Sequence, residues 1–137
     1  MRIYRSIALA LTGIFAAVGL IFLVAPGKVL DFFNYFSGSL NLPPAPASGF
    51  TFYLILAVGY MYIVTLLAFL MYRNPGNRIY PFLLAQAKLV SSFLSLALFC
   101  LQDHYLIYLA NFLVDGAIGF FVGLLYYRTG RTTWAYS

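Results

Sequence analysis

Four long apolar segments constrain this chain more than any other feature of its sequence. Each is close to the roughly 20 residues that an α-helix needs to cross the hydrocarbon core of a bilayer. Because lipid offers no partner for an unpaired backbone N–H or C=O group, we expect all four segments to be helical. They cover approximately residues 7–24, 50–72, 80–101 and 105–127. The sequence therefore predicts an all-α fold, a four-helix transmembrane bundle that forms one integral membrane domain over residues 1–137.

The composition agrees with a membrane protein. Of the 137 residues, 64% are hydrophobic and only 8% are charged, whereas a soluble domain carries about 25% charged residues. A formal charge of +5 would suit nucleic acid if the basic side chains formed a patch, but here they flank the apolar segments. We therefore expect contact with the lipid bilayer and none with nucleic acid.

The charged residues outside the segments predict an orientation. Arginines precede the first segment, separate the second from the third and follow the fourth, whereas Lys28, Asp31 and Asp103 lie on the opposite side. The positive-inside rule makes the arginine-rich side cytoplasmic. The basic start and the apolar run after it also resemble a secretory signal. That run is longer than a typical signal core, however, and "LVAPG" is a poor cleavage site. We expect a multi-pass protein of a cell inner membrane with both termini in the cytoplasm.

Only one connection is long, the predicted outer loop over residues 25–49. Its first part has apolar residues at helical spacing, which predict a short interfacial helix lying on the membrane surface. The following "LPPAPASG" is too rich in proline for a helix. Two interpretations remain open, a simple connector and a lid over a cavity that opens to the outer leaflet. The apolar side of the short helix would comprise Val29, Leu30, Phe32, Phe33 and Phe36.

Two charged residues lie inside the apolar segments, Lys88 in the third and Asp115 in the fourth. Charges at such depth are costly and usually face the interior of the bundle. Small and polar residues recur beside them at helical spacing, so we expect the third and fourth segments to pack polar face to polar face. The predicted polar or ligand-binding cluster comprises Lys88, Ser91, Ser92, Ser95, Asn111 and Asp115, and the predicted helix-packing residues are Gly116, Gly119 and Gly123.

Two arrangements fit Lys88 and Asp115. Their offset along the helix axis is about 4.5 Å, which a lysine side chain can span, but helical side chains lean toward their own N-terminus and these two lean apart. Either the two residues form an ion pair, which we favour, or Lys88 extends toward the cytoplasmic headgroups while Asp115 bonds to serines. Both arrangements are also compatible with a purely structural role in setting helix register.

The chain offers few groups for catalysis. Cys100 and His104 are its only cysteine and histidine, which excludes an intramolecular disulfide and bis-histidine haem ligation within the chain. A dyad of Lys88 with Ser91 or Ser92 is formally possible, but a hydrolase also needs an oxyanion hole and access to water. We expect no enzyme, no metal site and no cofactor other than a bound lipid or quinone.

The stretch "LTGIFAAVGLIFLVAPGKVLDFF" resembles the opening of small four-helix membrane proteins of the DoxX-like kind. Those proteins commonly have a glycine-bearing first helix that runs into a proline and a short amphipathic stretch, and the four-helix layout extends the resemblance along most of the chain. The resemblance implies a relation to a diverse group that includes accessory subunits of quinone-dependent redox systems. It implies no catalytic residue at any position here.

Three functions follow as hypotheses. The first is a non-catalytic accessory subunit of a larger membrane complex, with other membrane proteins as partners. The second is a lipid- or quinone-binding protein with its site between the third and fourth segments, in which Lys88 contacts a phosphate or quinone oxygen. The third is a small transporter or channel, which would need a homo-oligomer to form a pore at a symmetric interface.

Overall fold

The computed structural model describes residues 2–47 and 50–133, with backbone only for residues 50–52 and 129–133. These residues form the helices α1 (Arg2–Val24), α2 (Pro26–Ser39), α3 (Phe50–Arg73), α4 (Ile79–Leu101) and α5 (Leu106–Thr133). All of them except α2 are long and apolar enough to cross a membrane. The predicted all-α fold with four candidate spans is confirmed, and the chain is a small polytopic membrane protein.

The helix boundaries differ from the prediction mainly at the two ends of the chain. α1 already begins at Arg2 and α5 continues to Thr133, because a helix satisfies its own backbone groups and does not need to end where the apolar residues end. The predicted short helix of the long connection is confirmed as α2. It begins with Pro26 in its first turn, where the missing N–H of proline costs no hydrogen bond.

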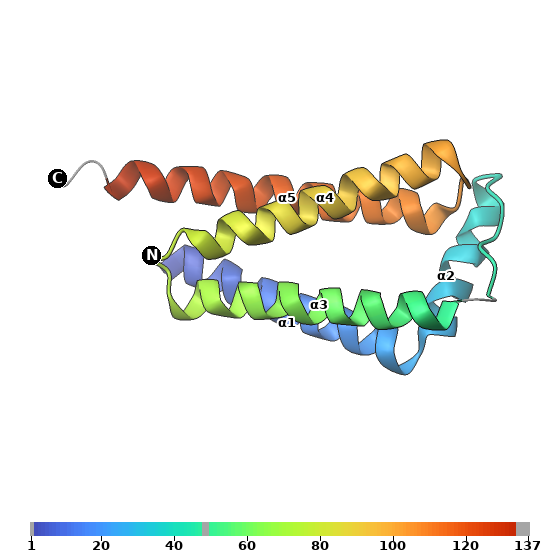
Figure 1. Cartoon of the computed structure of the whole chain (residues 1–137), viewed down its shortest axis with the longest axis horizontal. Helices are drawn as coiled ribbons and strands as arrows, with labels where there is room; N and C mark the ends of the chain where they lie inside the picture. Colours follow the sequence, from blue (N-terminus) through green and yellow to red (C-terminus); the bar gives the residue numbers. More distant parts are fainter. Residues whose placement is uncertain (1, 48–49, 134–137) are drawn as a thin grey trace.

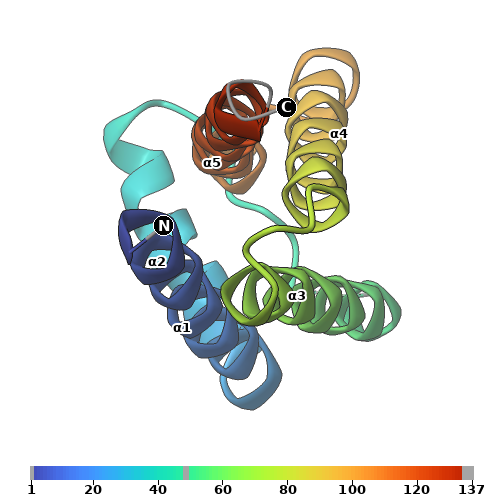
Figure 2. The same ribbon diagram turned by 90° about the vertical axis from the view of Figure 1, so that its left-hand side faces the viewer.

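The long helices are arranged as two closely packed antiparallel pairs, α1 with α3 and α4 with α5 (Figure 1). The two pairs are joined by a smaller contact between α3 and α4, and α2 crosses one end of the bundle, where it contacts both α1 and α5. In the view along the helices, the α1–α3 pair and the α4–α5 pair form two separate layers (Figure 2). The candidate functional site lies between these two layers.

The two ends of the bundle differ in charge. The start of α1, the turn between α3 and α4 and the far end of α5 lie together at one end (Figure 1), which brings Arg2, Arg5, Arg73, Arg78 and Arg128 to that end. Lys28, Asp31 and Asp103 belong to α2 and to the α4–α5 turn at the opposite end. The bundle therefore has an arginine-rich end, and its cytoplasmic location stays a prediction.

The apolar core is small and lies mainly between α1 and α3. Large apolar side chains elsewhere point outward, including Phe93 on α4, which is 67% exposed. A soluble bundle would bury such residues, whereas a membrane protein presents them to lipid tails. The fully buried core positions include Ala8, Phe15, Val64, Ala68, Met71, Leu84 and Val122.

Candidate functional site

The two intramembrane charges meet between the helix pairs. Nζ of Lys88 donates a hydrogen bond to Oδ1 of Asp115 at 2.8 Å, and the two residues are only 2% and 4% exposed. The ion pair favoured from the sequence is confirmed, and the alternative in which Lys88 extends toward the headgroups is wrong. Because an unpaired charge at this depth is costly, the flexible lysine stem bends to its partner although the two side chains start out in opposite directions.

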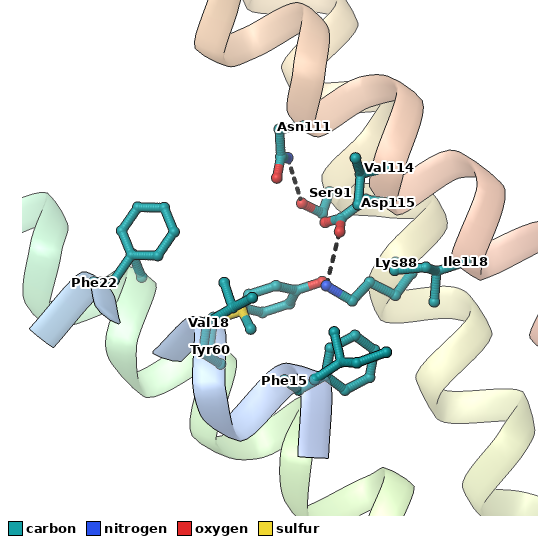
Figure 3. Close-up of a pocket in the computed structure, with 13 residues that line it drawn as sticks. Phe15, Val18, Phe22, Tyr60, Lys88, Ser91, Asn111, Val114, Asp115 and Ile118 are labelled. Atoms are coloured by element: carbon teal, nitrogen blue, oxygen red, sulfur yellow. Dashed lines mark hydrogen bonds and ion pairs between the residues drawn. The ribbon is translucent and has the colours of Figure 1, made fainter. Parts of the chain in front are cut away.

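Two aromatic rings complete the surroundings of the Lys88 ammonium (Figure 3). Nζ lies 4.7 Å from the ring centroid of Phe15 on α1 and 5.1 Å from that of Tyr60 on α3, distances at which the π face of a ring attracts a cation. The Tyr60 hydroxyl donates to the carbonyl oxygen of Ala87 on α4 at 3.1 Å. The ammonium is therefore the point at which all four long helices meet.

Phe15 and Tyr60 were not predicted as site residues from the sequence. The predicted site lay between the third and fourth segments alone, because only their residues had polar periodicity. Tyr60 carried a usable signal, since it lies in the middle of α3, whereas tyrosines of membrane proteins concentrate at the two interfaces. Phe15 carried none, because an apolar residue in a membrane helix is unremarkable.

Polar side chains lie along the contact between α4 and α5, which we call the polar seam (Ser91, Ser92, Ser95, Asn111 and Asp115). Nδ2 of Asn111 donates to Oγ of Ser91 at 3.1 Å and to Oγ of Ser95 at 2.6 Å. Oγ of Ser92 donates to the carbonyl oxygen of Phe112 at 2.8 Å. The predicted packing of polar face against polar face is confirmed, and every residue of the predicted polar cluster lies in or beside this seam.

Two of the three predicted packing glycines lie at close helix contacts. A Cβ atom added to Gly116 would lie 2.9 Å from Oγ of Ser92, and one added to Gly119 would lie 3.1 Å from the backbone nitrogen of Leu89. Gly123 is different, because a Cβ atom there would meet nothing within 4 Å.

The packing role predicted for Gly123 is therefore corrected. Near this end of the α4–α5 pair, large side chains occupy the space between the helices. The ring centroids of Phe82 and Tyr126 lie 5.8 Å apart, and the Arg78 guanidinium lies 4.5 Å from the Tyr126 ring. The GxxxG pattern contributes only its first glycine to a close contact.

A cavity of about 370 Å³ lies between the two helix pairs. We call it the central cavity. Its volume is within the roughly 300–1,000 Å³ of small-molecule sites. One wall, from α1 and α3, is apolar except for Tyr60, and the opposite wall, from α4 and α5, carries the ion pair and part of the polar seam (Figure 3). The residues that line the central cavity include Phe15, Val18, Ala57, Tyr60, Lys88, Ser91, Asn111 and Asp115.

A second cavity of about 450 Å³ adjoins the central one toward the α2 end of the bundle. The two share Phe22, Ala57 and Asn111 as lining residues. Leu30 of α2 and Ala45 line the second cavity, and Asn34 holds this segment in place through two hydrogen bonds with the backbone of Ala45, at 2.8 and 3.0 Å. α2 and the segment after it therefore border a cavity, which both the connector and the lid interpretation of the outer connection allow.

The described residues of the site form neither a Ser–Lys hydrogen bond nor a metal-ligand cluster. Among the described residues, the only hydrogen bond that Lys88 donates goes to Asp115 rather than to Ser91 or Ser92. In the same part of the chain, no three His, Cys, Asp or Glu side chains come together as metal ligands.

Comparisons with known proteins return nothing for this chain. No protein-family model matches it, and neither the curated proteins nor the solved structures contain a match. The resemblance to DoxX-like proteins therefore stays a prediction.

Proposed function

We propose that the protein binds a small amphipathic molecule of the bilayer, a lipid or a quinone, in the central cavity. One observation carries this proposal. The cavity joins an extended apolar wall to a polar wall that contains the ion pair of Lys88 and Asp115. An apolar chain and a polar head fit opposite walls of the same space.

The size of the cavity favours an occupant over a purely structural role for the ion pair. The central cavity is not closed, because its lining residues Ile14 and Val114 are 54% and 57% exposed. Concave, mostly apolar spaces between helices that carry a few polar groups are typical ligand sites. The hydrogen bonds of Asn111 and Ser92 and the close contacts of Gly116 and Gly119 already hold α4 against α5. An ion pair needed only for helix register requires no cavity of about 370 Å³ beside it.

The second cavity supports a route for the ligand. It continues from the central cavity past Phe22 to the region beneath α2. A ligand from the leaflet at that end would pass Phe22 to reach the ion pair, with α2 as a cover over the path.

The proposal is tested by filling the cavity. Ala57 lines both cavities, so Ala57→Phe is expected to remove most of the small-molecule adducts seen by native mass spectrometry of protein extracted gently from its own membrane. Ala17 lies on α1 with an exposed side chain, and Ala17→Phe adds the same volume on the lipid-facing side. This matched control is expected to keep its adducts.

The same variants separate the other hypotheses. Reproducible masses of additional protein subunits, with equal adducts in both variants, would support an accessory subunit, as the resemblance to DoxX-like proteins implies. Ion or solute flux in liposomes that the Ala57→Phe change blocks would support a transporter. We assign no catalytic step to the site.

A further inference from the structure

The arginine-rich end of the bundle carries more positive charge than the chain itself can balance. The whole sequence contains three acidic side chains. Asp115 is paired with Lys88 in the middle of the bundle, whereas Asp31 and Asp103 belong to α2 and the α4–α5 turn at the opposite end (Figure 1). The counter-charges for the arginines therefore have to come from outside the chain.

Three of these arginines lie together where α1 meets the end of α3. Arg2 and Arg5 are three residues apart on α1, a spacing that makes side chains neighbours on a helix. Nε of Arg5 donates to the carbonyl oxygen of Tyr72 at 3.3 Å, and Arg73 directly follows that tyrosine in the chain. We call Arg2, Arg5 and Arg73 the arginine cluster. Like charges at this spacing repel each other, and positive charges at the start of a helix oppose its dipole, so a bound anion stabilises the cluster.

The contacts of Arg5 leave one edge of its guanidinium available. Its Cζ lies 5.2 Å from the ring centroid of Tyr72, and its Nε is bound to the carbonyl oxygen of the same residue. The two Nη nitrogens form no hydrogen bond with the described part of the chain, and the residue is exposed. These nitrogens form a planar fork of donors that fits two oxygens of a phosphate. Because Tyr72 already orients the fork, less side-chain entropy is lost when a ligand binds.

An apolar surface continues from the arginine cluster along α1. Leu9 lies one turn after Arg5 on the same face of the helix and is 50% exposed, and Gly13, one turn further, is exposed as well. A phospholipid matches both parts of this surface, because its phosphate reaches the arginines while its acyl chains cover the apolar face. Basic side chains next to a membrane span attract anionic lipids in this way. A soluble acidic protein would match the charges alone, so the surface favours a lipid.

We propose that the arginine cluster binds the head group of an anionic phospholipid, with the phosphate on the Nη fork of Arg5 and with Arg2 and Arg73 as flanking charges. This site is separate from the central cavity and does not rest on the proposed function. A zwitterionic phospholipid carries the same phosphate but also an ammonium group, which the arginines repel. The cluster therefore distinguishes phospholipids by the net charge of their head groups.

The test compares two phospholipids with the same dioleoyl chains, the anionic phosphatidylglycerol and the zwitterionic phosphatidylcholine. The full-length protein, delipidated in detergent, is titrated with each lipid, and the bound fraction is measured by native mass spectrometry. We expect phosphatidylglycerol to bind about fivefold or more tightly, since each arginine beside an anionic lipid contributes about that factor.

Four variants locate the site. Arg5→Gln removes the charge and the fork, and we expect it to weaken phosphatidylglycerol binding about fivefold with little change for phosphatidylcholine. Arg5→Lys keeps the charge without the fork and is expected to lose less, but still a measurable part. Lys28→Gln removes one positive charge at the opposite end of the bundle and is the matched control. It is expected to keep the preference of the parent, as is Ala57→Phe, which fills the central cavity.

Several results would overturn the inference. Equal binding of the two lipids by the parent does so whether or not the variants fold. A preference that Arg5→Gln leaves unchanged, or that Lys28→Gln weakens equally, would trace binding to another site or to net charge alone. A soluble oligoglutamate peptide that displaces phosphatidylglycerol at equal charge would identify a surface for acidic proteins instead. Loss of phosphatidylglycerol in Ala57→Phe would place this lipid in the central cavity, which contradicts the inference and supports the proposed function.

Discussion

The helices of the two pairs are held together by different interactions. The α4–α5 pair is joined by hydrogen bonds from Asn111 and Ser92 across the interface. In the α1–α3 pair, the membrane-buried hydroxyls of Thr12 and Thr65 bond only to carbonyls of their own helices. There the close contact comes from Gly19, where an added Cβ would lie 3.1 Å from Cβ of Met61.

The difference shows how the bundle can hold a polar site without losing stability. In lipid, helices associate through close packing of small residues and through hydrogen bonds between helices. Around the central cavity, the α1–α3 pair uses the first means and provides an apolar wall. Its hydrogen bond between helices, from Nε of Arg5 to the carbonyl oxygen of Tyr72 at 3.3 Å, lies at the arginine-rich end. The α4–α5 pair uses both means beside the cavity and provides a polar wall. Because the two pairs contact each other little, the polar wall faces a cavity and is not covered by apolar side chains of the other pair.

The largest expected effect comes from breaking the ion pair of Lys88 and Asp115 between α4 and α5. Either Lys88→Met or Asp115→Leu alone leaves a buried charge without its partner, and we expect each to lower the free energy of unfolding by about 3–5 kcal/mol. The double variant removes both charges and is expected to be about as stable as the parent. Unfolding of the purified protein with SDS, followed by circular dichroism, measures all four proteins of the cycle.

A double variant that is as unstable as either single variant would contradict this prediction. It would mean that the stability of the polar wall depends on the charges themselves and not on their mutual compensation. The parent titrated in parallel provides the reference for the whole cycle.

A smaller effect is expected at the close contact of α4 and α5. Gly119→Ala places a Cβ atom 3.1 Å from the backbone nitrogen of Leu89, which cannot move aside, and we expect a loss of about 1–3 kcal/mol. Gly123→Ala adds the same atom to the same helix with nothing within 4 Å. That control is expected to be neutral or up to about 1 kcal/mol more stable, because alanine favours helix.

Thermal unfolding in one detergent is sufficient to compare the two glycine variants. Equal midpoints for Gly119→Ala and Gly123→Ala would show that α4 can shift away from α5. The polar hydrogen bonds, and not the glycine contact, would then determine their separation.

The smallest expected effect compares single hydroxyls of the two pairs. Ser92→Ala removes a bond from α4 to α5 and is expected to cost about 0.6 kcal/mol, a typical value for hydrogen bonds between membrane helices. Thr65→Val removes a bond within α3 and is expected to have almost no effect, because such a bond adds nothing between helices. The same SDS titration measures both, and a Thr65→Val loss as large as that of Ser92→Ala would remove the proposed distinction between the pairs.

Much of the polar seam was predictable because its signal is local. Lys88 and Ser92 share one face of α4, Asn111 and Asp115 share one face of α5, and the short turn between the helices requires them to be antiparallel neighbours. Spacing alone therefore predicted which polar groups would meet. The pairing of Lys88 with Asp115 was less certain from sequence, because the directions of the two side chains argued against it and the flexible lysine stem overcame that tendency.

The sequence by itself determined the four apolar spans, the polar faces of α4 and α5, and the separation of the arginines from Lys28, Asp31 and Asp103 at the opposite end. These features depend on hydropathy and helical periodicity, which can be recognised within a few turns of one chain segment. Only the tertiary structure decided that Phe15 and Tyr60 cover Lys88, that Gly123 takes no part in close packing and that a cavity of about 370 Å³ separates the helix pairs. Apolar residues in a membrane helix look alike whether they face lipid or a neighbouring helix. The arrangement of the two helix pairs decides which apolar residues face the Lys88 ammonium. The long connection through α2 and the short α3–α4 turn join these pairs.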